Sequence, residues 1–410
     1  MTLLSVDEAR SRILSQFEPL GRETLPLEKC ARRVLATDVA AQNDLPSFDN
    51  SSMDGFAVIA SDLQDTAPAS PRTLDVVADI PAGTSSDITL TPGQAARIMT
   101  GAPMPEGADA VIPVEETDFQ DRTPGAPLPE RVTVYKTLHV GDYVRARGTD
   151  VQTGQAVLQT GHKLRPQDLG LLAMLGVAEV PVYRKPRVAL LSSGDELLPV
   201  DAPLRPGKIR DSNTYTLSAL LDGAEVEVLN LGIAADRRES VEELLEKAAA
   251  QKVDLILSSA GVSVGTFDFI KDVVEEQGEL TFWRVNMRPG KPLAFGKFKN
   301  IPFIGLPGNP VSAFVGFEVF VRPALERMGG LEVGSRPRVR VRLAEDITSD
   351  GRESYLRATV REESGILSAH LAGHQGSGNL LSIVQANALL IIPAGVKSLA
   401  TGKEIDAWLL

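Results

Sequence analysis

The sequence contains one cysteine and only four histidines among its 410 residues. A single cysteine excludes disulfide bonds within the chain and zinc clusters built on thiolates. Cys30 lies near Leu27 and Val34 in an amphipathic stretch, which favours buried packing over a reactive role. His370 and His374 have the spacing of a helical metal pair, but the glycines beside them argue against a helix there. The scarcity of histidine also leaves few candidate bases for a catalytic triad.

Long apolar runs are absent, as is an excess of positive charge. No run of eighteen apolar residues occurs, and residues 1–10 lack the apolar core of a signal peptide. The 42 basic and 54 acidic residues give a net charge of −12, which argues against nucleic acid or an anionic membrane as the main partner. We therefore expect a cytoplasmic protein, in which any site for an anionic substrate has a local excess of positive charge.

The familiar phosphate-binding signatures are also missing, since neither a Walker A motif nor G-x-G-x-x-G follows a strand-like segment. What is present is VDLILSSAGVSVGTFD at 253–268, an aliphatic run followed by a turn of small and hydroxyl residues and the start of a helical pattern. A buried strand, such a turn and a helix start can present backbone N–H groups to an anion.

Two other segments repeat this design. An aliphatic run at 187–193 ends in a Ser-Ser-Gly turn, and a third run at 301–306 is broken by Pro-Gly-Asn-Pro. Strands alternating with helices predict a doubly wound, mostly parallel α/β sheet, in which the carboxyl ends of the strands face one crevice. We therefore predict a single active site at that edge, with binding residues Ser193, Gly194, Gly261, Ser263, Pro307 and Asn309.

Carboxylates occur at several predicted turns, and each has a structural alternative. Asp236 with Glu239 has the spacing of a capping box, and Asp268 is placed as an N-cap. Asp195 is placed to cap its own turn. Because Glu196 and Asp268 fall on the same predicted sheet edge, they favour a hard-cation site such as Mg²⁺.

Two cations, Arg288 and Lys291, sit in VNMRPGKP at 285–292, where prolines would fix the backbone beside an anion; the alternative is a solvated turn. Further along, RVRVRL at 338–343 alternates as a half-buried strand does, so the tail is predicted to be a small β-sandwich or barrel. Arg352 and residues 376–378 could bring this tail to the site, although spacing alone does not decide it. The residues by themselves predict an α/β domain that binds an oxyanionic ligand with a divalent metal.

Several longer stretches are characteristic, and they run nearly from end to end of the chain. They are FDNSSMDGFAV (48–58), IMTGAPMPEGADAVIPVEE (98–116), RARGTDV (145–151), LLSSGDEL (190–197), SSAGVSVGTFDF (258–269), RPGKP (288–292), GLPGNPVSAF (305–314) and GHQGSGNLLS (373–382). With them the chain resembles the molybdopterin molybdenumtransferases, the molybdenum-inserting enzymes related to the E domain of gephyrin.

The resemblance implies a multidomain α/β plus β protein. Residues 1–180 would form an elongated linker and dimerisation region with a β-rich insertion at about 28–145, residues 181–329 the α/β molybdopterin-binding domain, and residues 330–410 a C-terminal β-barrel. The implied assembly is a homodimer whose site is completed by the second subunit's N-terminal region. The implied reaction converts molybdate and adenylylated molybdopterin into molybdenum cofactor and AMP, with Mg²⁺.

The resemblance also assigns residues one by one. The acidic positions tied to pterin nucleotide, metal and catalysis are Asp150, Glu196, Asp236 and Asp268, with Glu196 and Asp268 as metal ligands. The positions expected near molybdate or pterin phosphate are Arg288, Lys291, Ser312 and Arg352, with Lys291 counted among the catalytic residues. The positions contributed by the partner subunit are Asp54 and Thr100.

Two positions depart from the family's common pattern. Ala260 stands where glycine is commoner, which matters if the backbone there requires a positive φ. Arg288 replaces a usual lysine, which keeps the charge but offers a planar fork in place of a point donor.

Two other functions remain as alternatives. The adenylyltransferase that makes the substrate, itself an expected partner, resembles the α/β domain alone, so the first 180 residues and the β tail argue against that activity. A non-catalytic scaffold, as gephyrin is at receptors, is disfavoured by the intact acidic set.

Overall fold

The computed structural model describes residues 3–85, 87–119, 121, 126–260, 269–334 and 336–410. The chain forms two compact units whose segments interleave in sequence. The main unit holds residues 1–37, 160–165 and 179–410, and the inserted unit holds residues 38–159 and 166–178. The two units are defined by contacts in space, and each combines segments that are separate in the sequence. They therefore do not test the consecutive domain boundaries predicted from the sequence, which stay a prediction.

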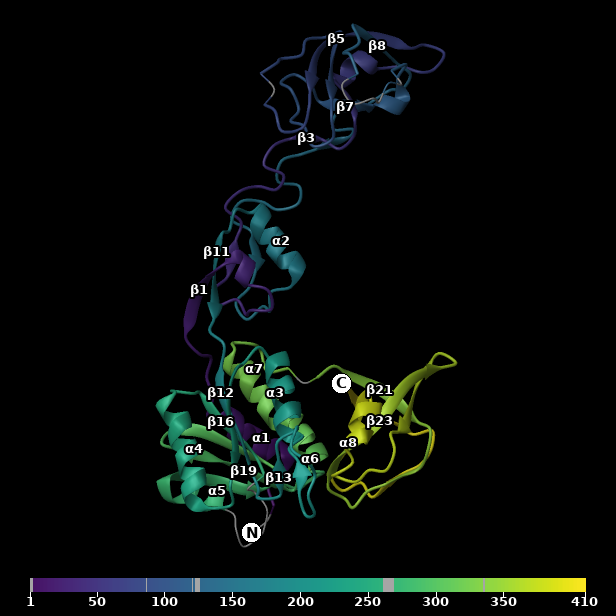
Figure 1. Ribbon diagram of the computed structural model, residues 1–410. Helices are drawn as coiled ribbons and strands as arrows, with labels where there is room; N and C mark the ends of the chain where they lie inside the picture. The colour runs from purple at the N-terminus through teal and green to yellow at the C-terminus, as the bar shows by residue number, and fades with distance from the viewer. Residues whose placement is uncertain (1–2, 86, 120, 122–125, 261–268, 335) are drawn as a thin grey trace. The chain divides into compact units, whose positions relative to one another are not determined.

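A six-stranded sheet forms the centre of the main unit, with strand order β15-β12-β16-β20-β19-β17 (Figure 1). The first four strands are parallel, whereas β19 runs antiparallel to β20 and β17 antiparallel to β19. The mostly parallel α/β sheet that the sequence predicts is thereby confirmed. The strands are β12 (Arg187–Ser193), β15 (Glu227–Ala234), β16 (Leu255–Ser259), β17 (Gly278–Arg284), β19 (Pro292–Phe298) and β20 (Ile301–Leu306).

Helices cover both faces of this sheet because alternate strand residues point to opposite sides. Leu190 and Leu257 join a core with the helices of one face, whereas Leu191 and Ile256 join a second core with those of the other. The first face carries α1 (Val6–Leu14), α3 (Asn213–Gly223), α6 (Pro310–Gly316) and α7 (Arg322–Met328). The second carries α4 (Arg238–Ala250) and α5 (Phe269–Gln277).

The strand order reverses at β12, since the chain places β15 on one side of it and β16 on the other. In open α/β sheets, ligands bind outside the carboxyl ends of the strands at such a reversal. The carboxyl ends of β12, β16 and β20 lie side by side there, which prepares a crevice before any side chain is considered.

The C-terminal part of the main unit is a closed five-stranded barrel, in which β23-β24-β21-β27-β25 follow one another and β25 pairs back with β23. The predicted barrel is therefore confirmed. Along β21 the arginines at 338, 340 and 342 are exposed, as the alternating pattern predicts. The strands are β21 (Arg338–Leu343), β23 (Glu353–Glu363), β24 (Ile366–Leu371), β25 (Ala388–Ile392) and β27 (Glu404–Leu409).

Shorter elements complete the main unit. Strand β18 extends the barrel by pairing with β23, and β1 pairs antiparallel with β11, which precedes the first strand of the sheet in the chain. Ser5 caps α1 by accepting the Glu8 N–H at 3.2 Å, in agreement with its capping sequence. These elements are β1 (Arg22–Pro26), β11 (Glu179–Tyr183), β13 (Leu197–Leu198), β14 (Ile209–Arg210), β18 (Met287–Arg288), β22 (Ile347–Thr348), β26 (Ser398–Leu399) and α8 (Leu380–Gln385).

The inserted unit is β-rich, as predicted, and is built on a five-stranded sheet of order β7-β4-β6-β5-β8. Phe56 and Ile112 are fully buried in one of its cores. Its elements are β2 (Val39–Ala40), β3 (Asn50–Ser51), β4 (Gly55–Val58), β5 (Arg72–Ile80), β6 (Gln94–Ile98), β7 (Ala110–Pro113), β8 (Arg131–Val134), β9 (Val144–Arg145), β10 (Ala156–Leu158) and α2 (Pro166–Met174).

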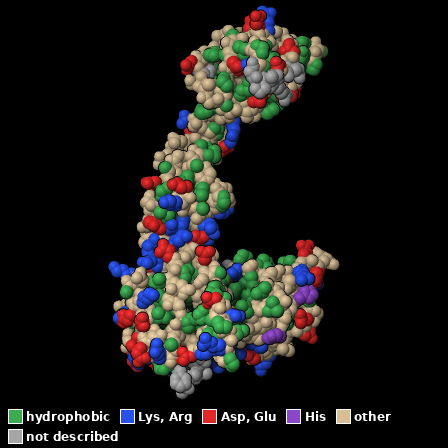
Figure 2. All heavy atoms as spheres, viewed as in Figure 1, with side chains coloured by type: hydrophobic (Ala, Val, Ile, Leu, Met, Phe, Trp, Pro, Cys, Tyr) green, Lys and Arg blue, Asp and Glu red, His purple; other side chains and the backbone are tan. Residues whose placement is uncertain are grey.

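Two expectations from composition can be followed in the structure. Cys30 is fully buried, as its apolar surroundings predict. Acidic and basic side chains are interspersed over the face of the main unit that Figure 2 shows, with no large region of one sign. Among the described helices, none is long and apolar enough to cross a lipid bilayer.

A buried ion-pair cluster joins the sheet to the barrel. Glu318, in the π-helical turn η4 (Phe317–Val321) between α6 and α7, is 2% exposed and accepts hydrogen bonds from Arg322 and Arg336. Arg336 also donates to the Leu409 carbonyl of β27 at 3.2 Å. Burial raises the pKa of Glu318, but the two guanidinium groups outweigh burial and hold the pKa below its usual value.

Glu318→Gln is expected to lower the free energy of unfolding by about 3 kcal/mol, because it removes the buried anion that two part-buried guanidinium groups share. Since the pKa is lowered in the folded state, this stabilisation is present above the pKa of an unfolded glutamate and is lost as pH falls below about 4. Urea unfolding of the wild-type protein and of Glu318→Gln should therefore show a difference in the free energy of unfolding near neutral pH, and this difference should become smaller in acid. Asp406→Asn, which breaks an exposed ion pair with Arg340, is the control and should change stability by less than about 1 kcal/mol. A difference in stability between the two proteins that does not change with pH would contradict the conclusion that the ionised Glu318 carboxylate stabilises the fold.

Candidate active site

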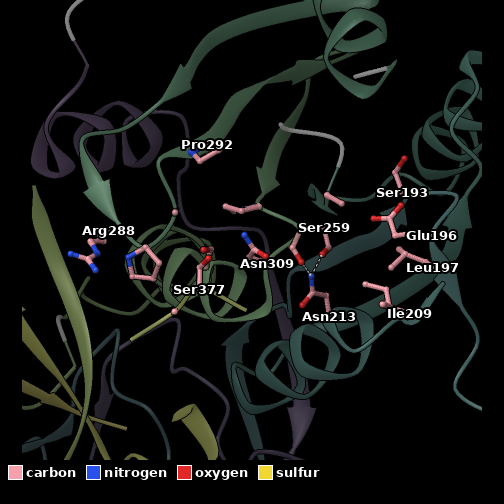
Figure 3. A pocket seen from close by; sticks show the side chains of 18 of the residues that line it. Ser193, Glu196, Leu197, Ile209, Asn213, Ser259, Arg288, Pro292, Asn309 and Ser377 are labelled. Carbon is pink, nitrogen blue, oxygen red and sulfur yellow. Dashed lines mark hydrogen bonds between the residues drawn. The ribbon is translucent and has the colours of Figure 1, made fainter. Parts of the chain in front are cut away.

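A pocket of about 710 Å³ opens at the carboxyl ends of β12, β16 and β20. Its size is typical of small-molecule sites. Figure 3 shows Ser193 and Glu196 at one end and Arg288 at the other, with Ser259 and Asn309 between them. The pocket is therefore long enough to present different chemistry to the two ends of one ligand.

The structure brings the turns after three parallel strands to this pocket. Ser193 ends β12 and Gly194 follows it, Ser259 ends β16, and Pro307 and Asn309 follow β20. All of them line the pocket. The other residues predicted on the turn after β16, Gly261, Ser263 and Asp268, lie outside the described residues. For the described positions, the parallel-sheet argument thus places the predicted binding residues around one cavity.

At one end of the pocket, the carboxylates of Asp195 and Asp236 each accept a hydrogen bond from the backbone N–H of the other residue. Asp236 accepts hydrogen bonds from the Ser193 hydroxyl at 3.2 Å and the Asp195 N–H at 3.1 Å, while Asp195 accepts the Asp236 N–H at 3.0 Å. Helix α4 begins two residues later with Arg237 as its N-cap and no side-chain cap. The capping-box interpretation of Asp236 and the local-cap interpretation of Asp195 are therefore wrong, because both carboxylates bond across the sheet edge.

Glu196 points into the same end of the pocket (Figure 3). Its carboxylate folds over Gly194, where a Cβ would lie 2.5 Å from Oε2 and where φ is +146°, a conformation that L side chains rarely adopt. Within the described part of the chain the Glu196 carboxylate has no hydrogen-bond or ion-pair partner. A carboxylate left unpaired beside hydroxyl-bearing turns is a ready ligand for a hard cation.

The described residues contain no cluster of three or more Asp, Glu, His and Cys side chains that could hold a metal ion. Mg²⁺ in phosphate-transferring enzymes is commonly held by one or two carboxylates together with oxygens of the substrate. Glu196 fits that mode, in which the ligand supplies the remaining donors.

The opposite end of the pocket is basic and includes a residue of the barrel. β18 pairs with β23 so that Arg288 lies opposite Ser354, and the Arg352 guanidinium donates to the Met287 carbonyl at 3.1 Å. Arg352 also donates to Asp350 and thereby lowers the pKa of that carboxylate. Arg288 and Arg352 both line the pocket, and Arg288 has no side-chain partner among the described residues.

Ser312 and Lys291 differ in their relation to the pocket. Ser312, on α6, is 3% exposed and lines the cavity. Lys291 is exposed and is not among the lining residues, although its neighbours Gly290 and Pro292 are. The catalytic role predicted for Lys291 therefore stays a prediction.

Asn213 and Gln375 also line the pocket, and neither was predicted from the sequence. Asn213 donates to the Ser259 hydroxyl at 2.7 Å and to the Gly308 carbonyl at 2.8 Å, so it ties the turn after β16 to the turn after β20 (Figure 3). Gln375 and Ser377 come from the barrel, and the Ser377 carbonyl accepts the Val311 N–H at 3.1 Å. Residues 376–378 were expected from the sequence as a segment that could bring the tail to the site, and Gly376 and Ser377 do line the pocket.

Asp54, Thr100 and Asp150 belong to the inserted unit and are described within it. Asp54 accepts the N–H and the hydroxyl of Thr100, both at 2.7 Å, so these two predicted residues lie together. Asp150 forms an ion pair with Arg145.

Three known families match consecutive parts of the chain. "MoeA N-terminal region (domain I and II)" matches residues 4–176, "Probable molybdopterin binding domain" matches residues 189–327, and "MoeA C-terminal region (domain IV)" matches residues 340–410. A molybdopterin molybdenumtransferase of Nostoc sp. is 40% identical over 91% of the chain and 85% of its own length. The chain belongs to the molybdopterin molybdenumtransferase family.

Other members of the molybdopterin molybdenumtransferase family match over their whole length. Molybdopterin molybdenumtransferase 2 of Mycobacterium tuberculosis is 38% identical, with 98% of this chain and 99% of that protein aligned. The molybdopterin biosynthesis MoeA protein of Pyrococcus horikoshii superposes with a TM-score of 0.83 at 32% identity and covers 100% of this chain and 99% of its own.

Ala260 and Arg288, the two positions expected to depart from the family's common pattern, both line this pocket. Ala260 has φ of +70°, in the left-handed region that a Cβ disfavours. Its methyl group also lies against Gly308, where an added Cβ would approach it to 3.2 Å. The backbone at 260 is therefore of the kind that glycine adopts without strain.

Ala260→Gly is expected to raise the free energy of unfolding by about 1 kcal/mol, because glycine adopts a positive φ without the steric cost that alanine meets. Urea unfolding near neutral pH measures this difference. Ala248→Gly, inside α4, is the matched control and should lower stability by about 1 kcal/mol. Equal losses in the two variants would show that position 260 is not strained.

Proposed function

We propose that the protein transfers molybdenum from molybdate to adenylylated molybdopterin and releases AMP. The family supports this reaction. The observation that carries it is the division of one pocket into an end with free and hydrogen-bonded carboxylates and an end with two arginines. An adenylylated pterin carries a phosphoanhydride that suits a cation-binding end, and a tetrahedral metal oxyanion suits an arginine-lined end.

The basic end is proposed to bind molybdate. Arg288 and Arg352 offer planar pairs of N–H donors, which match the oxygens of a dianion. Ser312 offers a hydroxyl from the same wall. Lys291 is proposed to act from the rim, where its exposed ammonium group can meet an incoming anion.

The carboxylate end is proposed to bind the nucleotide-tagged pterin and Mg²⁺. Glu196, with Asp268, would hold the ion, which when bound polarises the phosphoanhydride and steadies the departing phosphate. Asp236 holds the turn after β12 in place through Ser193 and the Asp195 N–H, so its carboxylate is fixed before substrate arrives. The residues proposed to bind the substrate itself are Ser193, Gly194, Gly261, Ser263, Pro307 and Asn309.

We further propose that the enzyme is a cytoplasmic homodimer, in which Asp54 and Thr100 of one subunit serve the site of the other, and that Asp150 belongs to the catalytic acidic set. The hydrogen bonds between Asp54 and Thr100 make these two residues a single polar group, which supports a shared role. The adenylyltransferase that supplies the substrate is the proposed partner enzyme.

An adenylyltransferase activity is less well supported by the pocket. Arg352, Gln375 and Ser377 come from the barrel and line the cavity together with the turns of the sheet. An enzyme of the α/β domain alone would lack this wall.

The deciding experiment mixes the purified protein with adenylylated molybdopterin, Mg²⁺ and molybdate, and measures AMP and active cofactor. Release of AMP that depends on molybdate is expected. Formation of adenylylated product from ATP and molybdopterin would instead identify the adenylyltransferase, and no turnover in either direction would support a scaffold.

Glu196→Gln is expected to lower the rate of AMP release by roughly 100-fold and to raise the Mg²⁺ concentration needed for half-maximal activity, because the amide binds a hard cation poorly. Its unfolding temperature should stay that of the wild-type protein, since the carboxylate has no partner among the described residues. Glu404→Gln, at an exposed position on β27, is the control and should leave both quantities unchanged. If Glu196→Gln needs the same Mg²⁺ concentration as the wild-type protein for half-maximal activity, Glu196 is not a ligand of the ion.

A further inference from the structure

A second cavity, of about 80 Å³, lies at the edge of the central sheet opposite the candidate active site. Pro186 lines it directly before β12 begins, and Glu225 lines it two residues before β15, so the cavity is at the amino ends of these strands. Its other walls come from the ends of α3 and α7 and from residues 32–34, 163 and 183–185. All of these segments belong to the main unit. We call this cavity the amino-edge pocket.

Basic side chains dominate the lining of the amino-edge pocket. Its cations are Arg32, Arg33, Lys163, Arg184, Lys185 and Arg322, and only two carboxylates line it with them. When the ion-pair partners of these groups are included, seven cations meet five carboxylates. Glu225, for example, is shared by Arg32 Nε at 3.2 Å and Lys185 Nζ at 2.8 Å. In a chain with a net charge of −12, this local excess of positive charge favours an anionic ligand.

Several N–H donors at the amino-edge pocket are not used by the protein itself. Lys163 forms no hydrogen bond or ion pair with any described side chain, although its backbone is fixed by pairing with Val34. The ion pair of Arg32 runs through Nε, so the terminal nitrogens of its guanidinium have no partner in the described part of the chain. Lys185 uses one of its three N–H groups, on Glu225. An oxyanion can use such donors, because each of its oxygens accepts hydrogen bonds.

The ion pair between Arg32 and Glu225 joins two residues with unusual backbone. Arg32 has φ of +65° and Glu225 has φ of +59°, in the left-handed region that L residues with long side chains rarely adopt. Such conformations persist only where the surrounding structure holds them, and they cluster at ligand sites. Their occurrence on both sides of one ion pair therefore agrees with a binding role for the pocket that both residues line.

One carboxylate of the lining opposes an anion only weakly. The Glu326 Oε2 atom is buried and has no hydrogen-bond partner among the described residues. Burial raises the pKa of this carboxyl group. Its negative charge is therefore more easily lost when an anion binds beside it than that of an exposed glutamate would be.

The volume of the amino-edge pocket limits the ligand to a small ion. At about 80 Å³ it is far smaller than the candidate active site, at about 710 Å³, and lies below the roughly 300 Å³ at which pockets for larger organic ligands begin. A dianion would balance an excess of two positive charges. We propose that the amino-edge pocket binds a free tetrahedral oxyanion of the phosphate class, held by Arg32, Lys163 and Lys185.

The bound ion would hold two connecting segments of the chain against the sheet. Residues 32–34 come before the inserted residues 38–159, and residue 163 comes after them. A ligand that contacts both segments and the folded sheet binds the native state and not the unfolded chain, so it raises stability. The proposal does not depend on the reaction, and its test involves no turnover.

Five variants separate this pocket from the rest of the protein. Lys163→Met and Arg32→Met each remove one cation of the pocket, and Lys163→Arg keeps the charge. Arg288→Met removes a cation of the candidate active site and so reports phosphate bound there. Lys247→Met is the matched control, because this exposed lysine of α4 has no ion-pair partner in the part of the chain that the structure describes.

Each protein is titrated with inorganic phosphate at constant ionic strength, with chloride as the replaced anion, by calorimetry and by the unfolding temperature. Phosphate at about 100 times its Kd should raise the unfolding temperature of the wild-type protein by about 2 °C or more. The Kd should rise about tenfold or more in Lys163→Met and Arg32→Met, and stay within about twofold in Lys163→Arg, Arg288→Met and Lys247→Met. In chloride alone, Lys163→Met should unfold no earlier than the wild-type protein, because it removes an unbalanced charge.

Equal stabilisation by phosphate in the wild-type protein, Lys163→Met and Arg32→Met would overturn the proposal, as would stabilisation that Arg288→Met alone abolishes. A wild-type protein that phosphate does not stabilise would also overturn it. If Lys163→Met does not fold, an unchanged Kd in Arg32→Met is sufficient to reject the site. AMP carries the same phosphate group on a nucleoside too large for the cavity. Stabilisation by AMP and not by phosphate, abolished in Lys163→Met, would overturn the free ion as the ligand.

Discussion

The candidate site depends on one short backbone pairing. Met287 and Arg288 of β18, in the segment between β17 and β19, add to the edge of barrel strand β23 opposite Glu353 and Ser354. Backbone pairing fixes the register of the two strands, so Arg288 is held near Arg352. The Arg352 guanidinium also donates a hydrogen bond to the Met287 carbonyl, which strengthens this connection. The basic end of the pocket is therefore made by the sheet and the barrel together. The Glu318 cluster, which bonds Arg336 and through it β27, holds the same two parts from another side.

Charge separation inside the pocket explains how an acidic protein can offer an anion site. The chain carries a net charge of −12, but the carboxylates at the pocket belong to the turns after β12 and β15, and the arginines belong to β18 and the barrel. Opposite charges separated along a cavity create a field across the ligand, and low-dielectric walls strengthen it. Asp350 limits the spread of Arg352's charge, whereas Arg288 and Arg357 remain without carboxylate partners among the described residues.

The part of this architecture that follows from local pattern could be predicted from the sequence. Aliphatic runs that end in small polar turns gave the parallel strands, and parallel strands place their carboxyl ends together, so Ser193 and Asn309 were expected on one edge. Asp236 was not predictable in the same way, because its capping spacing with Glu239 is real in sequence but its carboxylate finds better partners in the turn after β12. Asn213 and the barrel wall depend on contacts between segments far apart in the chain. No periodicity reports such contacts.

The buried arginine shows why the remaining residues escape pattern-based reasoning. A fully buried cation contradicts the rule that charged groups stay at the surface or find a counter-ion, and local sequence would place Arg357, in the middle of a barrel strand, facing solvent. Positions where such general rules fail are commonly functional, because an arrangement that serves a binding or catalytic site can lower the stability of the protein. Three hydrogen bonds to neutral acceptors reduce the free-energy cost of burying the Arg357 guanidinium. These hydrogen bonds hold the side chain in place but do not neutralise its charge. The same hydrogen bonds hold the His374 and Gly376 carbonyls in place, so a side chain that local pattern would put in solvent instead fixes a segment that lines the pocket.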